Sequence, residues 1–401
     1  MKDAFIADGV RTPIGNLKGA LSGIRADDMA ALVLKELVDR NPNIPASSVD
    51  DVIMGCANQA GEDNRNVARM ALLLAGIPFT VPGETVNRLC ASGMSAVINA
   101  ARAIHSGDGD VFIAGGVEHM TRGPWVISKT SQAFGTDAQM YDSGFGWRFI
   151  NPRMHEMYGT DSMGMTGENV AERYHISRED QDLFAYHSQM KAAAARKSGR
   201  LAEEIVPVSI AQKKGEPQIV NEDEFLKPNT TTERLAQLKP AFLKTGTVTA
   251  GNAAGLNDGA AALYVLSSDA LRQYNVTPKA RIVSSAVTGV EPRIMGIGPV
   301  SATQKALAKA GLTLKDIDII EINEAFAAQS IACLRELGIA DNDPRVNPNG
   351  GSIAIGHPLG MTGARIVNSA ALELQKQQKR YALATMCIGL GQGYAVILER
   401  A

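Results

Sequence analysis

The sequence predicts an α/β protein made of two similar halves, with a loop-rich domain inserted between them. The chain has 401 residues, more than one hydrophobic core usually holds. A unit of alternating helices and strands occurs twice along it, and the stretch between the two copies lacks that alternation. The expected division is residues 1–121 for the first part of the N-terminal half, 122–250 for the inserted loop domain, 251–276 for the return to the N-terminal half, and 277–401 for the C-terminal half.

The first part of the repeated unit is a helix followed by a buried, β-branched strand. Residues 29–37 have an amphipathic helical pattern and lead through an acidic turn to the strand within 48–56. Residues 303–310 lead to the strand within 314–323 in the same way. The matching order indicates one structural unit used twice.

The second part of the unit is a loop, a helix and another strand. Cys90 precedes a helix at 93–104 and a strand at 111–114, and the other copy has a helix at 360–376 and a strand at 381–386. This alternation predicts parallel sheets covered by helices. Because helix 93–104 is almost uncharged on every face, we expect it to be buried beside helix 360–376 in a central layer. Cys90 would then lie at a helix N-terminus, a position that favours a thiolate.

The region between the two copies reads as a covering loop domain. Ser177 begins a long helix that ends near residue 199, and the segments 213–217 and 227–231 are polar and loop-like.

Composition excludes several classes of protein. The formal net charge of -2 argues against a nucleic-acid-binding surface, and 45% hydrophobic residues is ordinary for a globular protein. The four cysteines are too few and too scattered for a disulfide framework and show no zinc-site spacing, so no metal is expected. No targeting segment or membrane-spanning run is recognised, and the expected location is the cytoplasm.

Cys90, His357 and Cys387 each lie in a segment of small residues and together predict the chemistry. Two thiols and one imidazole provide a nucleophile, a base that activates it and a second acid/base, which acyl exchange between thioesters requires. An acyl-cysteine is itself a thioester, so the exchange is nearly isoenergetic. Taken singly, Cys90 could be a buried structural thiol and His357 a hydrogen-bonded structural residue.

Two further segments have competing interpretations. The loop 389–393 resembles a phosphate-binding loop, but a strand rather than a helix follows it, so an oxyanion hole that uses backbone N–H groups is the better interpretation. Asn323 ends a buried strand, and a polar catalytic role or a helix N-cap is equally compatible with that position.

These residues resemble the thiolase family over essentially the whole chain. Six segments carry the resemblance: Asn87-Arg88-Leu89-Cys90, Gly115-Gly116-Val117-Glu118, Gly246-Thr247-Val248-Thr249-Ala250-Gly251-Asn252, Asn323-Glu324-Ala325-Phe326, Gly356-His357-Pro358 and Cys387-Ile388-Gly389. The resemblance implies the thiolase fold, two βαβαβαββ halves about a pseudo-twofold axis with an inserted loop domain. It also implies a homotetramer built as a dimer of dimers, with part of the inserted domain bridging the dimers.

The resemblance assigns a role to each site residue. Cys90 would be the acylated nucleophile, His357 its base, and Cys387 the acid/base at the α-carbon of the acetyl unit. Asn323 would hold a water that forms one oxyanion hole with His357, and the N–H groups of Cys90 and Gly389 would form the other. Coenzyme A would be a co-substrate with no permanently bound cofactor, and the residues at its contact positions are Lys227, Met163, Phe242, Ala254 and Phe326.

Three positions depart from the family pattern. Ala91 replaces a glycine, Ala254 replaces a serine that bonds the pantetheine arm, and Lys227 replaces an arginine that stacks on adenine. Looser coenzyme A binding is the expected consequence.

Within the family, three segments are similar to those of the 3-oxoadipyl-CoA thiolases, which act in aromatic compound degradation by the β-ketoadipate pathway. These segments are 55–66, 146–152 and 289–296. Such a substrate ends in a carboxylate, and enclosing that charge requires a cation. Arg148 is the first candidate for that cation and Arg65 the second, although either could pair with a surface or interface acid.

The alternatives are a broad 3-ketoacyl-CoA thiolase of fatty acid β-oxidation, an acetoacetyl-CoA thiolase, and a decarboxylating ketosynthase. The ketosynthases use a second histidine where this chain has Cys387. A non-catalytic acyl-CoA carrier is the alternative of another class. In each case the partners would be small acyl-CoA molecules, not nucleic acid or membrane.

Overall fold

The computed structural model describes residues 2–401. The strands are β1 Ala4–Arg11, β2 Gly15–Asn16, β3 Asp51–Gly55, β4 Gly83–Val86, β5 Val111–His119, β6 Trp125–Ile127, β7 Met140–Asp142, β8 Val208–Ile210, β9 Gln218–Val220, β10 Asn257–Ser267, β11 Ala280–Gly289, β12 Ile319–Ile322, β13 Tyr381–Ile388 and β14 Gln392–Arg400. The α-helices are α1 Ala26–Arg40, α2 Val67–Leu74, α3 Ser92–Ser106, α4 Pro152–Tyr158, α5 Met163–Arg173, α6 Arg178–Lys197, α7 Thr232–Ala236, α8 Ser268–Gln273, α9 Gly298–Ala310, α10 Ala327–Glu336, α11 Ser352–Ile355 and α12 Leu359–Lys376. Short 3-10 helices cover Ala20–Gly23, Ala46–Ser48, Leu89–Ala91, Leu201–Glu203, Pro292–Ile297 and Leu314–Asp316.

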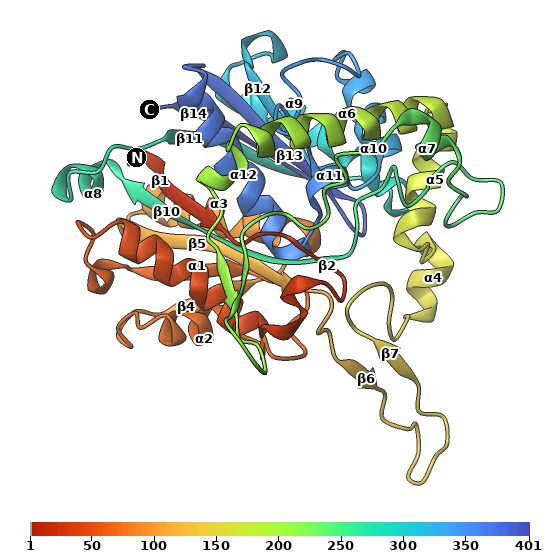
Figure 1. Ribbon diagram of the computed structural model, residues 1–401, viewed down its shortest axis with the longest axis horizontal. Helices are drawn as coiled ribbons and strands as arrows, with labels where there is room; N and C mark the ends of the chain where they lie inside the picture. Colours follow the sequence, from red (N-terminus) through yellow and green to blue (C-terminus); the bar gives the residue numbers. More distant parts are fainter. Residues whose placement is uncertain (1) are drawn as a thin grey trace.

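The two halves share one sheet. Ten strands pair in the order β12-β13-β14-β11-β1-β10-β5-β3-β4, with β2 added to β10. The halves join where β1 pairs with β11, a short antiparallel contact of Phe5 with Arg281 and Ile6 with Ala280. Figure 1 shows β1 and β10 at the centre of the molecule and the two chain ends close together. Backbone pairing between β1 and β11 therefore joins the two predicted halves into one continuous sheet.

The sheet is mixed, and the expectation of parallel sheets was wrong. Only β3 with β4, β3 with β5, and β12 with β13 are parallel. Strand β10, which follows the long insertion, enters antiparallel to β5. Strand β14 runs antiparallel to β13 because the tight 389–391 turn returns the chain alongside the strand it has left. Positive φ angles at Leu390 (66°) and Gly391 (81°) make that turn possible.

Helices α3 and α12 form the expected central layer. They share one hydrophobic cluster with the strands of both halves, while α1 and α2 cover the opposite face in the N-terminal half and α9 covers it in the C-terminal half. The two central helices approach at glycines: a Cβ at Gly93 would lie 2.5 Å from the Gly360 carbonyl oxygen, and one at Gly363 would lie 2.4 Å from the Met94 nitrogen. This close approach brings the beginnings of both helices together.

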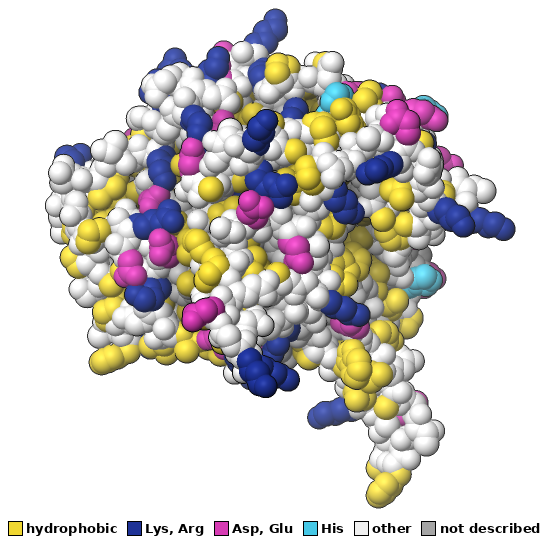
Figure 2. Space-filling model, viewed as in Figure 1, with side chains coloured by type: hydrophobic (Ala, Val, Ile, Leu, Met, Phe, Trp, Pro, Cys, Tyr) yellow, Lys and Arg dark blue, Asp and Glu magenta, His cyan; other side chains and the backbone are white. Residues whose placement is uncertain are grey.

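The region between the halves contains β6 to β9 and α4 to α7, and Ser177 caps α6 by accepting from the Asp180 N–H (3.0 Å). The division of the chain at residues 121, 250 and 276 stays a prediction. One part, the β6–β7 arm, projects away from the rest of the molecule (Figure 1). It exposes Trp125 (72%), Ile127 (65%) and Phe134 (103%), and Figure 2 shows hydrophobic atoms along it.

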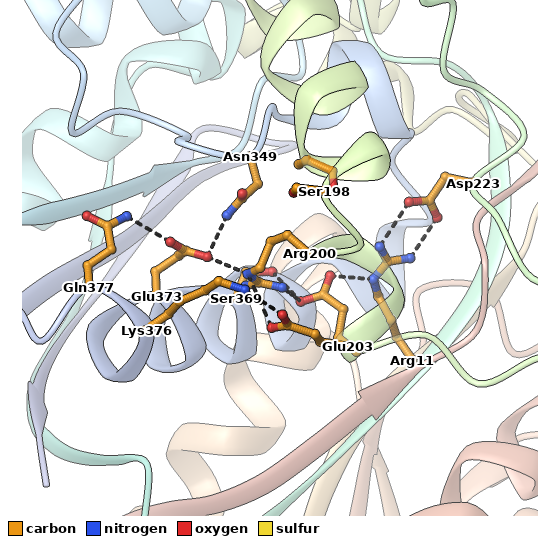
Figure 3. Close-up of polar contacts among 12 residues, drawn as sticks. Arg11, Ser198, Arg200, Glu203, Asp223, Asn349, Ser369, Glu373, Lys376 and Gln377 are labelled. Carbon is orange, nitrogen blue, oxygen red and sulfur yellow. Dashed lines mark hydrogen bonds and ion pairs between the residues drawn. The ribbon is translucent and has the colours of Figure 1, made fainter.

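A buried ion network ties the inserted region to both halves (Figure 3). Arg11 of β1 donates to both oxygens of Asp223 (2.6 and 2.9 Å) and to Glu204 (2.6 Å), while Arg200 donates to Glu373 of α12. Burial raises the pKa of Glu204, but Arg11 and Arg200 outweigh it and lower the pKa to about 2. The network is thus charged at neutral pH. No helix among residues 2–401 is both long and apolar enough to cross a membrane.

Candidate active site

One cavity of about 330 Å³ is lined by residues of both halves and of the inserted region. Cys90, His357 and Cys387, which lie far apart in the sequence, all line it. The sheet and the two central helices therefore bring the predicted nucleophile, base and second acid/base to one cavity.

Cys90 lies in the 3-10 turn Leu89–Ala91, directly before α3 begins at Ser92. The backbone N–H groups of Gly389 and of Cys90 itself face its sulfur. Burial nevertheless raises the pKa of the Cys90 thiol to about 11, because the two N–H groups only partly offset the loss of water. The two N–H groups lower the pKa of the thiol, as expected at this helix start, but burial outweighs them, so a base that accepts the thiol proton is needed.

His357 lies on the loop between α11 and α12 and is held on three sides. Its backbone N–H donates to Asn257 Oδ1 (2.9 Å), its Nδ1 is 2.7 Å from Thr362 Oγ1, and its Nε2 is 3.3 Å from Asn323 Nδ2. Burial, and next the charge of Arg365, lower the pKa of His357 to about 3. The imidazole is therefore neutral at neutral pH, as a general base must be.

Asn323 directly follows β12, and its side chain contacts His357 and the Ser352 hydroxyl rather than the start of α10. Helix α10 begins at Ala327 with Phe326 in the cap position, so the N-cap interpretation of Asn323 was wrong. Cys387, near the end of β13, is 1% exposed, and burial raises the pKa of its thiol well above the ordinary value. A thiol that stays protonated can act as an acid.

The positions expected to contact coenzyme A fall into three places. Met163, Ala254 and Phe326 line the cavity. Lys227 lines a neighbouring groove with Arg234 and lies 5.2 Å from the ring of Phe225. Phe242, 46% exposed, packs over Gly164 outside the lining of either space.

The two arginines proposed as carboxylate readers are placed differently. Arg148 lines the cavity, where its Nη1 donates to the Ser143 carbonyl (3.2 Å), and no carboxylate among residues 2–401 forms an ion pair with it. Arg65 is exposed and is not among the residues that line the cavity. The cavity thus contains one of the two candidate cations, Arg148.

The sequence interpretation gave no role to several polar residues here. Glu118 lines the cavity and accepts from the N–H groups of Ala57 (2.9 Å), Asn58 (3.0 Å) and Gly360 (2.8 Å). Burial raises the pKa of Glu118 to about 7, although the three N–H donors act to lower it. Glu118 belongs to the recognised segment 115–118, so the sequence could have marked it as a candidate site residue. Its contacts with the distant residues Ala57, Asn58 and Gly360 could not be predicted, because they arise only in the folded chain. Residues 2–401 contain no group of three or more metal-ligating side chains.

Comparison with known proteins defines the class. Residues 4–269 match the family described as "Thiolase, N-terminal domain" and residues 276–400 match "Thiolase, C-terminal domain". The chain belongs to the thiolase family and is an acyltransferase. With this, the thiolase fold predicted from the sequence is confirmed.

Individual relatives narrow the comparison. The chain is 60% identical over 400 residues to "Beta-ketoadipyl-CoA thiolase" of Escherichia coli, covering 100% of both chains. It is 46% identical to "Acetyl-CoA acetyltransferase" of Chromobacterium violaceum, again covering 100% of both. The crystal structure of the Bacillus anthracis acetyl-CoA acetyltransferase superposes with a TM-score of 0.92 at 40% identity, over 100% of this chain and 99% of that one.

Proposed function

We propose that this protein cleaves 3-oxoadipyl-CoA with coenzyme A to succinyl-CoA and acetyl-CoA, by acyl transfer through Cys90. The observation that carries the chemistry is the meeting of Cys90, His357 and Cys387 in one cavity. A relative 60% identical over its full length is named for the same substrate class.

In the first half-reaction, Cys90 gives its proton to His357 Nε2 as its sulfur attacks the 3-keto carbon. The pKa values of the thiol (about 11) and the imidazole (about 3) lie far apart, so the proton moves during attack rather than before it. The bond between C2 and C3 then breaks, and Cys387 protonates the departing enolate to give acetyl-CoA. Cys90 is left as a succinyl thioester.

In the second half-reaction, coenzyme A takes the acyl group. The Cys387 thiolate accepts the proton of the coenzyme A thiol, whose sulfur attacks the acyl carbon on Cys90. The departing Cys90 sulfur recovers its proton from His357, which returns both cysteines and the imidazole to their first state. The N–H groups of Gly389 and Cys90 stabilise one oxyanion, and a water held by Asn323 stabilises the other together with His357.

The substrate proposal depends on Arg148. A 3-oxoadipyl chain carries a carboxylate at its far end, and burying it without a cation is costly. Arg148 is the one Lys or Arg among the residues that line the cavity, and it has no acidic partner in residues 2–401. Its hydrogen bond to the Ser143 carbonyl is supported by Asn58 Nδ2, which donates to the same oxygen (3.0 Å).

A matched pair of substrates tests this. Arg148→Ala should lower kcat/KM for 3-oxoadipyl-CoA on the order of ten- to a hundredfold more than for uncharged 3-oxohexanoyl-CoA, the range of one charge-assisted hydrogen bond. Arg148→Lys should recover part of the selectivity. The control is Arg153→Ala, an exposed arginine of α4 outside the cavity lining, which should change neither rate.

The wild-type panel should include acetoacetyl-CoA. Equal losses on both six-carbon substrates would reject Arg148 as the carboxylate reader. A wild-type preference for acetoacetyl- or long-chain 3-oxoacyl-CoA would replace the proposed substrate, and an absence of turnover on every substrate would favour the carrier alternative.

We also propose a homotetramer, a dimer of dimers, as the working assembly. The projecting β6–β7 arm exposes Trp125, Ile127 and Phe134, and such apolar exposure is typical of a surface covered by another chain. Light scattering should give four times the chain mass of 42.5 kDa. Trp125→Glu combined with Phe134→Glu should give a smaller species, and an unchanged mass would remove the arm from the assembly.

A further inference from the structure

Five hydrogen bonds run in a single line through the candidate site. They join Arg365 Nη2 to Ser352 Oγ (3.2 Å), Ser352 Oγ to Asn323 Oδ1 (2.6 Å), Asn323 Nδ2 to His357 Nε2 (3.3 Å), His357 Nδ1 to Thr362 Oγ1 (2.7 Å), and Thr362 Oγ1 to the Pro358 carbonyl (2.8 Å). All five side chains in the line are buried. The line begins at Arg365 of α12, passes through both Asn323 and His357, and ends at Pro358, directly before α12; of its five side chains, His357 is the one that lines the cavity.

The two ends of the line fix the direction of every proton in it. A guanidinium can only donate, so Ser352 Oγ must accept from Arg365 and its own proton is available for Asn323 Oδ1. A carbonyl can only accept, so Thr362 must donate to Pro358 and accept from His357 Nδ1. A neutral His357 that carries its proton on Nδ1 has a lone pair on Nε2, which Asn323 Nδ2 can meet. Each end independently requires the same amide orientation of Asn323.

We infer that Thr362, Ser352 and Arg365 are positioning residues: Thr362 keeps the proton of His357 on Nδ1 and so leaves Nε2 unprotonated, and Ser352 with Arg365 fixes the Asn323 amide beside Nε2. Only the tautomer with its proton on Nδ1 can take a proton from Cys90. Asn323 Nδ2 donates to the same Nε2 lone pair, so this hydrogen bond must break when Nε2 takes the proton of Cys90, and the Asn323 N–H then becomes free to donate to a water at a developing oxyanion. The catalytic part of this inference rests on the proposed role of His357 as the base, but the proton arrangement does not.

Thr362 should matter most. It makes the short bond on the Nδ1 side, whereas Ser352 acts through the longer 3.3 Å contact between Asn323 and His357. Arg365 is less suited to mutation, because its removal would leave buried Glu321 without the nearby charge that lowers its pKa.

Neutron diffraction of the wild-type crystal at neutral pH tests the proton arrangement without any substrate. We expect deuterium on His357 Nδ1 and none on Nε2, with the Thr362 hydroxyl directed at the Pro358 carbonyl. Deuterium on Nε2 would overturn the inference, whatever the enzyme acts on.

Substitution at Thr362 tests the catalytic part. Thr362→Val keeps the shape but removes the hydroxyl, and it should lower both kcat and the rate at which iodoacetamide alkylates Cys90 on the order of tenfold or more, with KM little changed. Thr362→Ser restores the hydroxyl and should recover most of both rates. The control is Thr303→Val, a buried threonine of α9 whose hydroxyl contacts Thr385 (3.4 Å), which should alter neither rate.

The outcomes separate this inference from the proposed function. If Thr362→Ser is as slow as Thr362→Val, the methyl group and not the hydroxyl matters, and the positioning role is rejected. If alkylation of Cys90 depends on Thr362 as expected but 3-oxoadipyl-CoA is not cleaved, the positioning role stands and the substrate proposal fails.

Discussion

Cys90 and His357 occupy corresponding loops in the two halves, but the helices that follow them contribute differently to the site. Helix α3, after Cys90, is nearly uncharged, and the hydroxyls of Ser92 and Ser95 near its start accept from the backbone and side chain of Arg88. Helix α12, after His357, supplies Thr362 in its first turn and Arg365 in its second.

This difference follows from what each residue needs. A nucleophilic thiol needs the backbone N–H groups that a turn provides, and a helix without charges leaves those groups free for the substrate. A base needs a defined tautomer, which requires side chains of its own. One repeated unit can thus place two residues alike, while the polar side chains of α3 hold the loop before Cys90 and those of α12 hold the His357 side chain itself.

Replacing the nucleophile should cause the largest loss of activity and test whether Cys90, rather than a residue of the other half, carries the acyl group. Cys90→Ser should lower turnover at least on the order of a thousandfold, because a hydroxyl is a poorer nucleophile and forms a less exchangeable ester. Mass spectrometry of the wild type, given 3-oxoacyl-CoA without free coenzyme A, should find the acyl group on Cys90. An acyl group on Cys387 would reverse the roles of the two halves.

Removing the second thiol should be the next largest effect and should separate acylation from carbon chemistry. Cys387→Ala should slow exchange of the acetyl α-hydrogens with solvent on the order of a hundredfold or more, and it should slow acylation of Cys90 less. The control is Cys333→Ala, a buried thiol of α10 that donates to the Gly296 carbonyl (3.2 Å). Undiminished deuterium uptake into acetyl-CoA would rule out the acid/base role.

Crowding the contact between the two helices should have a smaller, structural effect. Gly93→Ala places a Cβ 2.5 Å from the Gly360 carbonyl oxygen, and backbone on both sides limits relaxation. The free energy of unfolding should fall by about 1–3 kcal/mol in urea denaturation, the usual cost of overpacking. Gly289→Ala is the control, since its Cβ would lie 3.9 Å from the nearest atom. Equal stability of the two variants would mean that α3 and α12 can separate at no cost.

The sequence predicted the helices, the strands and the reactive residues well. It predicted less well how the strands pair with one another. The sequence repeat predicted four helices and the strands beside them, because hydrophobic periodicity is a local property. These helices are α1, α3, α9 and α12. Cys90, His357 and Cys387 were identifiable because the chemistry restricts those positions to particular residue types. Parallel strands were expected where most pairs are antiparallel, because strand direction depends on where a long insertion returns the chain.

What the sequence by itself determined is therefore the class of fold, the repeat and the reactive groups. Packing alone shows that Arg148 and not Arg65 lines the cavity, and that burial raises the pKa of Cys90 and lowers that of His357. It also joins Arg365, Ser352 and Thr362 in one line with Asn323 and His357. The physical reason is that residue type and periodicity are written along the chain, whereas desolvation and hydrogen-bond direction arise only when distant segments pack together.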